Sequence, residues 1–345
     1  MQSYIQNIHI TKPQIIATDD FRGILGGIVG EASFYSNIID CSLSEAQIEA
    51  WYASSIGGIA GTISTSSQIA NCLFSGNIDG GNEIGGITSM ASSNNQIINC
   101  HTNANIYGTK KIGGVIAVSD RARIANCFVE GSIELDASAS EGRIGAIAAE
   151  VANSFTDTIT PIIKNCLVNV ESITIKNPAK KYIHRIAGYT SADIWEYNWD
   201  SIDYDEPQTN WPKIYGTAEK CFKNNYVISA LLPFDSNIAT EPTTTEGADY
   251  KDGLNIEWLT NLEYSLNDST WNYDSSTGLT LWFELNPDGP ITTPDDDDPV
   301  NVENNITQSP IIYDGEIIST QGSITLYNLN GIKIAQGINT LSTSN

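Results

Sequence analysis

The sequence predicts an all-β protein whose main part is a right-handed parallel β-helix (solenoid) of about six to seven coils. A C-terminal cap and a small β-sandwich-like tail are expected to follow it. Two patterns that recur along one chain lead to this prediction: a column of cysteines and a block with paired glycines. The repeats are rich in Ile, Val, Thr, Asn, Ser and Gly and contain only short apolar runs, which favours strands over leucine-rich or helical repeats.

The first pattern is the cysteine column, whose first four members stand roughly 28 residues apart. An isoleucine lies three residues before each of the first five cysteines, and an Asp or Asn directly precedes them. Strict alternation would place isoleucine and cysteine on opposite faces of a strand, so we expect a bend at the Asp or Asn, residues that tolerate the αL conformation. Both columns then stack inside the solenoid. The structural ladder comprises Cys41, Cys72, Cys100, Cys127, Cys166 and Cys221.

The cysteines of this ladder could either form disulfides or remain free thiols. Coils about 4.8 Å apart would bring neighbouring cysteines within disulfide range. Their parallel side-chain directions would strain such a bond, so free thiols are expected.

The second pattern is the glycine block upstream of each cysteine. It reads Gly26-Gly27-Ile28-Val29-Gly30 in the first copy and Gly57-Gly58-Ile59-Ala60-Gly61 in the second, and it recurs less completely afterwards. Paired glycines permit a tight corner or a close approach between backbones. Three short strands with three turns account for the repeat length, so each repeat is expected to be one three-stranded coil. Parallel crossovers are generally right-handed.

These repeats resemble the Gly-Leu-apolar-Gly (GLUG) repeats of bacterial surface proteins, at Gly27-Ile28-Val29-Gly30 and Gly58-Ile59-Ala60-Gly61. Isoleucine replaces leucine here, and the later copies lose the closing glycine. The resemblance extends over roughly residues 20–230. It implies a β-helical, exported surface protein, and it implies less about activity, because such repeats occur in adhesins and in unrelated surface proteins.

The chain divides into four predicted parts: a β-helix with GLUG-like repeats at 1–235, its C-terminal cap at 236–288, an acidic Pro/Asp linker at 289–300, and a partial C-terminal β-domain at 301–345. A cap is expected because the open end of a solenoid exposes apolar core and unpaired strand edges.

Inside the cap, leucines and a tryptophan spaced by four predict a short amphipathic helix over 252–267, and an apolar run predicts a strand over 279–285. Further on, Asn330-Gly331 predicts a hairpin. The segment Leu326 to Gly331 resembles the C-terminal domain that sorts proteins through the type IX secretion system of Bacteroidetes.

The charge balance excludes some partners. With 17 Lys+Arg against 41 Asp+Glu, the net charge of −24 argues against nucleic acids and anionic membranes, which require a basic face. No apolar run is long enough to span a membrane. The start of the sequence lacks the basic and apolar regions of a signal peptide, so the expected extracellular or outer-membrane location assumes a leader outside this sequence.

Motifs for catalysis, metals and cofactors are not found in the sequence. The three histidines lack metal-ligand spacing, and His101 is expected at a turn or on the surface. The run Asp295–Asp298 lacks the Gly and Glu of an EF-hand loop and is interpreted as linker. We therefore predict no catalytic residue, no metal and no cofactor.

The candidate ligand-binding residues lie in an insertion at 189–216, which interrupts the sixth repeat and is expected to project as a loop. Flat aromatic rings with acceptors at their rim suit the faces and hydroxyl groups of sugars. The alternative is that these aromatic residues fold back over the last coils. The candidates are Trp195, Tyr197, Trp199, Asp203, Asp205 and Trp211.

The sequence thus favours an exported, non-catalytic binding or adhesion protein whose partners are glycans or host and cell-surface proteins. One alternative is a β-helical polysaccharide lyase or glycoside hydrolase, which needs two opposed carboxylates or a base beside a cation. A passive surface stalk is the other alternative.

Overall fold

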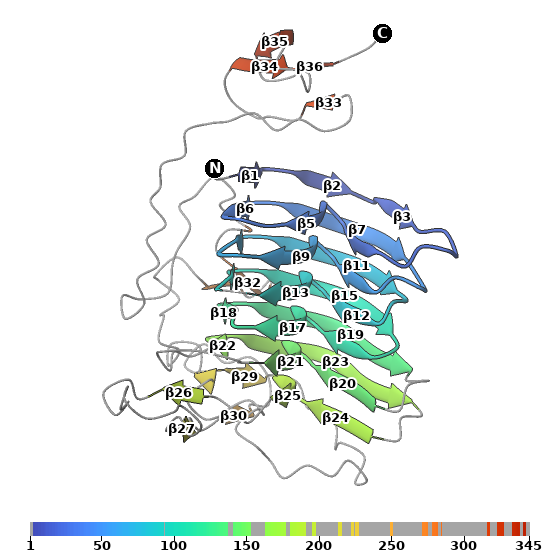
Figure 1. The fold of residues 1–345 in the computed structure, drawn as a ribbon, viewed down its shortest axis with the longest axis vertical. Coiled ribbons are helices and arrows are strands. Elements are labelled where there is room, and N and C mark those ends of the chain that lie inside the picture. Colours follow the sequence, from blue (N-terminus) through green and yellow to red (C-terminus); the bar gives the residue numbers. More distant parts are fainter. Residues whose placement is uncertain are drawn as a thin grey trace, which may run out of the picture.

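A computed structural model describes residues 3–92, 94–136, 141–152, 163–176 and 180–190, with short segments at 195–197, 213–215, 222–223, 225–227, 249–250, 271–274, 278–281, 284, 316–317, 323–327, 333–338 and 341–342. The regular elements in these residues are β-strands. Most of them stack as a parallel β-solenoid, which confirms the predicted fold class (Figure 1). Among the described residues, no helix has the length and hydrophobicity needed to cross a lipid bilayer.

Each coil contributes a strand to each of four parallel sheets. The first sheet contains β1 (Ser3–Gln6), β6 (Ser36–Ile39), β10 (Gln68–Ala70), β14 (Gln96–Ile98), β18 (Arg123–Ala125), β22 (Ile163–Lys164) and β28 (Phe222–Lys223). The second contains β2 (His9–Thr11), β3 (Gln14–Ile16), β7 (Ser42–Glu49), β11 (Leu73–Asp79), β15 (His101–Gly108), β19 (Phe128–Asp136), β23 (Leu167–Lys176), β29 (Tyr226–Val227) and β30 (Asp249–Tyr250).

The third sheet contains β4 (Ile24–Gly26), β8 (Ser55–Gly57), β12 (Glu83–Gly85), β16 (Lys111–Gly113), β20 (Glu141–Gly145) and β24 (Lys180–His184). The fourth contains β5 (Val29–Ala32), β9 (Ala60–Ser64), β13 (Thr88–Ser92), β17 (Ile116–Asp120), β21 (Ala148–Ala152) and β25 (Ala187–Thr190). The first coil contains β1–β5, with β2 and β3 both in the second sheet; sets of four strands then recur from β6–β9 to β22–β25, and β28 and β29 begin a further coil.

The expectation of three strands per coil is wrong, because the glycine block forms a corner between two short strands. In the second coil, Gly58 and Ile59 separate β8 from β9. A Cβ atom on Gly57 would lie 1.8 Å from the carbonyl oxygen of Ala60, and one on Gly58 would lie 2.1 Å from that of Gly86 in the next coil. The glycines are therefore required by close backbone approach, both within the corner and between coils.

The bend between the isoleucine and cysteine columns is the one that the sequence predicts. Asn71, Asn99 and Asn126 have φ angles of 52°, 53° and 54°, in the left-handed region. Their side chains form a ladder: the amide of Asn71 donates to Asp40 (2.9 Å), that of Asn99 to Asn71 (3.2 Å) and that of Asn126 to Asn99 (3.0 Å). The bend turns isoleucine and cysteine toward the same interior, where Ile69 and Cys72 are fully buried.

Five cysteines line the interior as free, buried thiols: Cys41, Cys72, Cys100, Cys127 and Cys166. The next position of the column belongs to a different residue from the one expected. Because Phe222 pairs with Ile163 and Tyr226 with Leu167, Asn225 stands where Cys166 stands in the preceding coil. The side-chain oxygen of Asn225 accepts a hydrogen bond from the backbone N–H of Cys166 at 3.0 Å. This register corrects the assignment of the position to Cys221, which itself lies outside the described residues.

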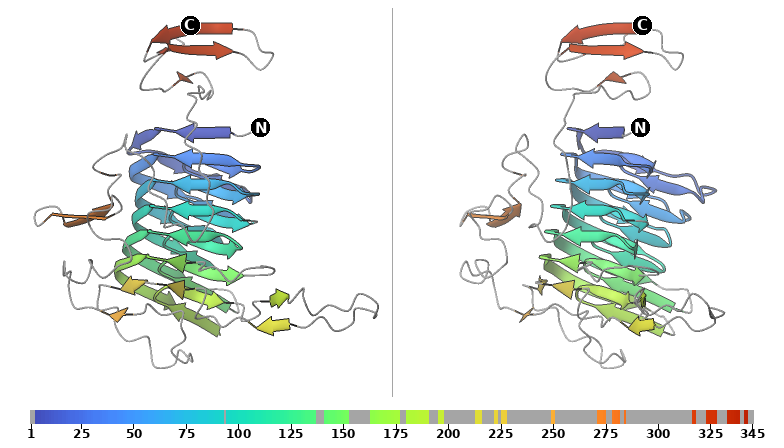
Figure 2. Two further views of the ribbon diagram at one scale, coloured as in Figure 1. Left: turned by 90° about the vertical axis from the view of Figure 1, so that its left-hand side faces the viewer. Right: turned by 60° about the vertical axis from the view of Figure 1, so that its left-hand side comes forward.

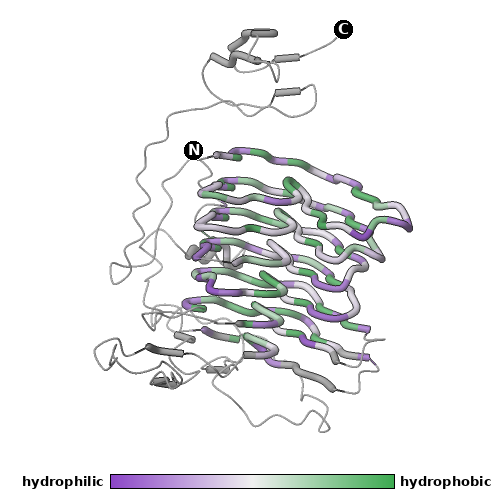
Figure 3. The backbone as a smooth tube through the Cα atoms, in the orientation of Figure 1, coloured by the Kyte–Doolittle hydropathy of each residue, from purple (hydrophilic) through white to green (hydrophobic). Residues whose placement is uncertain are grey.

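Hydrophobic and hydrophilic residues alternate along the coils (Figure 3). This alternation gives each strand an inner apolar face and an outer polar face.

Four antiparallel pairs lie outside the solenoid sheets: β26 (Trp195–Tyr197) with β27 (Lys213–Tyr215), β31 (Trp271–Asp274) with β32 (Gly278–Leu281), β33 (Glu316–Ile317) with β36 (Leu341–Ser342), and β34 (Ser323–Tyr327) with β35 (Lys333–Ile338). The last pair flanks Asn330-Gly331 and confirms the predicted hairpin. The β31–β32 hairpin lies beside the middle coils (Figure 2). The helix expected over 252–267 and the linker expected over 289–300 lie outside the described residues.

The asparagine bend leads to a stability prediction. Replacing Asn99 by alanine removes a ladder hydrogen bond and forces a Cβ-bearing residue without a polar side chain into the left-handed region. We expect Asn99→Ala to lower the free energy of unfolding by about 2–4 kcal/mol, the sum of a left-handed backbone cost and a lost buried hydrogen bond. The measurement is urea denaturation followed by circular dichroism.

The matched control is Asn99→Gly, which keeps the backbone freedom and loses only the ladder contact. It should lower the free energy of unfolding by less than Asn99→Ala does. Equal losses for the two variants would contradict a conformational role for this column.

Candidate functional site

The outward surface of the second sheet, called the outer face below, carries two polar arrangements. Its strands β7, β11, β15, β19 and β23 pair in register apart from local bulges, so outward side chains form columns that cross successive coils. One arrangement is a buried cluster around His101, and the other is a partly exposed strip of amides, acids and aromatic rings.

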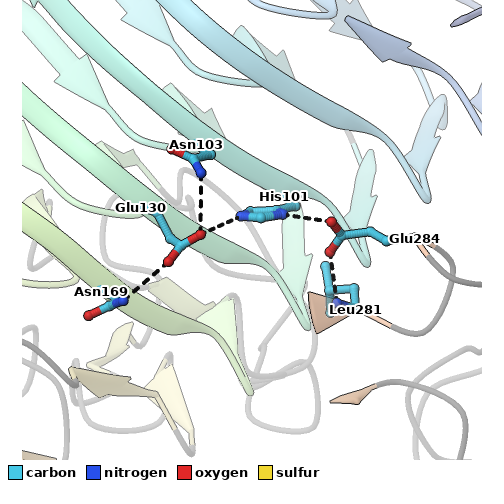
Figure 4. Close-up of polar contacts among 6 residues, drawn as sticks. All are labelled: His101, Asn103, Glu130, Asn169, Leu281 and Glu284. Carbon is cyan, nitrogen blue, oxygen red and sulfur yellow. Dashed lines mark hydrogen bonds and ion pairs between the residues drawn. The ribbon is translucent and has the colours of Figure 1, made fainter. Parts of the chain in front are cut away.

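The His101 cluster joins the solenoid to a distant segment of the chain (Figure 4). His101 begins β15, directly after the bend at Asn99 and Cys100, and its ring points outward. Its Nε2 lies 3.3 Å from a carboxylate oxygen of Glu130, and its Nδ1 lies 3.1 Å from one of Glu284. The second carboxylate oxygen of Glu284 accepts the backbone N–H of Leu281 at 2.8 Å. The imidazole thus links two coils to the segment that follows β32.

Other contacts hold the cluster in place. The imidazole stacks on the Phe128 ring with the centroids 4.7 Å apart. The second oxygen of Glu130 accepts from the amide of Asn169 at 3.2 Å. His101 is only 5% exposed, and Leu281 is fully buried. An outward position on the sheet is therefore covered, and the histidine lies in an interface inside the chain rather than at the surface turn expected from the sequence.

The protonation state of His101 follows from its two acidic partners. Burial alone would lower its pKa, but the hydrogen bonds and charges of Glu130 and Glu284 outweigh burial and raise the pKa from 6.5 to about 9. The ring is therefore an imidazolium ion at neutral pH, with both nitrogens engaged. Such a histidine serves as a charged clamp and not as a general base.

The partly exposed strip, called the amide strip below, is built on a ladder of side chains one per coil. The amide of Asn77 donates to Gln47 at 3.0 Å, that of Asn105 donates to Asn77 at 3.1 Å, and the hydroxyl of Ser132 donates to Asn105 at 2.7 Å. These residues stand opposite one another in the register of the strands. Each rung fixes the rotamer of the next, so the polar groups are preorganised.

Three acids and one aromatic ring form the neighbouring column. Glu49 pairs in register with Asp79, Asp79 with Tyr107, and Tyr107 with Glu134. Partial burial raises the pKa of Asp79, the amide of Gln47 opposes that shift with a hydrogen bond, and the negative charge of Glu49 adds to it.

Trp51, in the turn after β7, is 52% exposed and meets the Tyr107 ring edge-on with the centroids 5.7 Å apart. A large ring thus stands half-exposed beside the ladder.

A third polar cluster, on the third and fourth sheets, is internally neutralised. Lys111 contacts Glu83 and Glu150 at 2.9 Å each, and Arg143 contacts Glu150 at 2.5 Å. Burial works against the charge of Glu150, but Lys111 and Arg143 outweigh it and lower the pKa of its carboxyl. The cluster ties coils together, and its acids are paired with cations. Among the described residues, no group of three or more His, Cys, Asp or Glu side chains could hold a metal ion.

The candidate residues from the sequence fall in two groups. Trp195 and Tyr197 lie on β26, which pairs with β27 as an antiparallel hairpin beside the last coils (Figure 2). Trp199, Asp203, Asp205 and Trp211 lie outside the described residues.

Sequence reasoning missed both arrangements on the outer face. One signal was available: Asn77, Asn105 and Ser132 stand at the same offset from the cysteine of their repeat. The pairing of His101 with Glu284 left no such signal.

No protein-family profile matches the sequence, and no curated protein matches it. Among solved structures, the chain is similar to a "putative immunoglobulin A1 protease" from Bacteroides ovatus, with 17% identity and a TM-score of 0.47, over 81% of this chain and 74% of that one.

The clamp around His101 predicts a pH-dependent stability. The pKa of His101 is raised to about 9 in the folded state, so its protonated ring contributes to the free energy of unfolding. This contribution is fully present below pH 6.5 and is lost as the pH rises from 6.5 through 9. We expect the melting temperature of the wild type to fall over that range. The His101→Gln variant should have a lower melting temperature than the wild type at pH 6.5, and its melting temperature should change less between pH 6.5 and 9.

The control for this titration is Glu284→Gln, which keeps the shape of the side chain and removes its charge. We expect it to lower the free energy of unfolding by about 1.5–3 kcal/mol at pH 6, as loss of a charge-assisted hydrogen bond does. A wild-type profile that stays flat between pH 6.5 and 9 would show that His101 is not held as a cation.

Proposed function

We propose that this chain is an exported surface protein that binds glycans on the outer face of its solenoid without cleaving them. One observation carries the proposal: a half-exposed Trp51 is held against Tyr107 beside a preorganised amide ladder. Sugars present apolar C–H faces and hydroxyl edges, which flat rings and amide groups match. A rigid sheet places these groups with little entropy left to lose on binding.

The polar clusters favour binding over cleavage. Hydrolysis of a glycosidic bond needs two carboxylates on opposite sides of the sugar, one of them protonated, and a lyase needs a base beside a neutralising cation. Glu130 and Glu284 face the imidazolium of His101 and hold it. Glu150 is paired with Lys111 and Arg143. These carboxylates are committed to ion pairs. Glu49 and Asp79 on the outer face stand side by side on adjacent strands of one sheet and are not opposed across a sugar, which also supports a non-catalytic function.

Export is part of the proposal and rests on the sequence. The GLUG-like repeats resemble those of bacterial surface proteins, and the segment near Asn330-Gly331 resembles a type IX sorting domain. A net charge of −24 suits a well-hydrated surface protein. Retention of secreted protein on the outer membrane, assayed with and without residues 301–345, tests this part.

The β26–β27 hairpin is a second candidate binding position. It carries Trp195 and Tyr197 on one strand, and it departs from the solenoid where an insertion interrupts the repeat. Loops held by a rigid scaffold commonly carry function. The hairpin and the amide strip make separate predictions, so their contributions can be measured independently.

The test combines retention and turnover on a panel of polysaccharides. We expect retention on at least one glycan with no new reducing ends and no unsaturated products. Trp51→Ala should weaken that retention about tenfold or more, the effect of removing a central aromatic anchor, with little change in melting temperature. New reducing ends that grow with time would favour the hydrolase or lyase instead.

Two variants serve as controls. Phe34→Ala removes an aromatic ring that is 66% exposed and lies on a turn away from the second sheet, and it should leave retention unchanged. Trp195→Ala reports on the hairpin. If Trp195→Ala abolishes retention and Trp51→Ala does not, the binding site lies on the β26–β27 hairpin and not on the outer face.

A further inference from the structure

We propose that the amide strip recognises an uncharged glycan in an extended conformation, laid parallel to the solenoid axis with successive sugars on successive coils. This inference rests on the proposed function and adds the chemical class and the direction of the ligand. It combines the geometry of the ladder, the charges beside it and the position of Trp51.

The ladder offers matching hydrogen-bonding groups at a regular interval. A side-chain amide has two N–H donors and two acceptor lone pairs. The ladder uses one donor and one acceptor at Asn77 and at Asn105, which leaves each amide a second donor and a second lone pair. Asn105 is exposed, and Asn77 is half-buried. The strip therefore presents unused donors and acceptors on adjacent coils.

The interval between coils suits a sugar chain. Paired strands lie about 4.8 Å apart, which is close to the length of one pyranose unit in an extended glycan. The rungs Gln47, Asn77, Asn105 and Ser132 lie on four consecutive coils. A chain that runs along the axis thus meets an equivalent polar group with every sugar, and a chain that runs along the strands does not.

The charges of the strip select against anionic glycans. Glu49 and Asp79 stack on adjacent coils, and Asp136 accepts a hydrogen bond from the Tyr107 hydroxyl at 3.2 Å. Lys176, which pairs in register with Asp136, forms an ion pair with Glu134. Uronates and sulfated sugars would meet uncompensated carboxylates, whereas a neutral hydroxyl can donate to them. Burial raises the pKa of Asp79, so its carboxylate is stabilised by a hydrogen bond that a sugar hydroxyl donates to it.

Trp51 lies along one side of the strip, because its ring reaches from the turn after β7 to Tyr107 on β15. Its turn is packed on the next coil, because a Cβ atom on Gly80 would lie 2.6 Å from the Cα of Trp51. Gly80 also has a φ of +104°, which side chains rarely adopt. The backbone N–H of Ala50 donates to the carbonyl of Asp79 at 2.9 Å. The ring is thereby held at the edge of the acidic column, where it can stack on one sugar of the chain while the ladder holds the neighbouring sugars.

The experiment measures the affinity of the full chain for neutral β-linked gluco-, manno- and xylo-oligosaccharides of two to six sugars by isothermal titration calorimetry. We expect one series to bind with an affinity that rises with each sugar up to about four, the number of rungs, and then levels off. Affinity should change less than twofold between low and high salt, because neutral ligands are not screened. A matched uronate series should bind at least tenfold more weakly.

Two variants separate the anchor from the ladder. Trp51→Ala should weaken short and long oligosaccharides alike, by about tenfold. Ser132→Ala should weaken tetrasaccharides by at least fivefold and disaccharides little, because Ser132 lies one coil beyond Tyr107 and a disaccharide stacked on Trp51 can bind without reaching that rung. Asn37→Ala, on the first sheet, is the matched control and should change neither; melting curves exclude misfolding in all three variants.

Each outcome decides between the claims. Preferred binding of uronates, binding of cationic glycans that disappears with salt, or affinity independent of length would overturn this inference and leave glycan binding in place. So would retention that depends on Trp195 and not on Trp51 or Ser132. If no glycan of the polysaccharide panel or of these series binds, the proposed function fails, and this inference fails with it.

Discussion

The register between coils is the constraint on which the rest of the structure depends. Asn71, Asn99 and Asn126 turn the chain through the left-handed region, and their amides bond coil to coil in one ladder. The bend brings isoleucine and cysteine to the same side, so both columns reach the interior. A slip of one residue would send these apolar side chains outward and break the ladder, so the register is strongly specified. Glycine corners then permit the backbones of adjacent coils to meet at this spacing.

In-register stacking has a consequence on the outside as well. The same alignment that stacks thiols inside places equivalent polar side chains in columns on the outer face. Gln47, Asn77 and Asn105 are bonded to one another because their strands are aligned. The solenoid thus converts a one-dimensional repeat into a two-dimensional array of donors, acceptors and rings. An array of this kind suits a polymeric ligand better than a small compact one, since each coil repeats a similar contact.

The two polar arrangements on this face differ in their relation to solvent. At the start of the strands, His101 is sealed between Glu130 and Glu284, and the segment that contains Leu281 covers it. Toward the end of the strands, Asn105 and Trp51 remain open. In a solenoid each coil touches mainly its neighbours, so stability is close to a sum of local terms. A clamp between residues 183 positions apart adds a long-range tie that the repeat lacks.

The sequence by itself determined the parallel solenoid, the left-handed bend at the asparagines and the buried cysteine column, because each follows from a pattern that recurs within the chain. The tertiary structure decided the features in which the chain departs from its repeat pattern. Each coil has four strands where three were expected, with β8 and β9 on the two sides of the corner at Gly58, and the register places Asn225 in the column in place of Cys221. The contact between His101 and Glu284 could be found only from the tertiary structure. Its partner Glu284 comes from outside the repeats, and no periodicity links two side chains that meet only when a distant segment packs against the sheet.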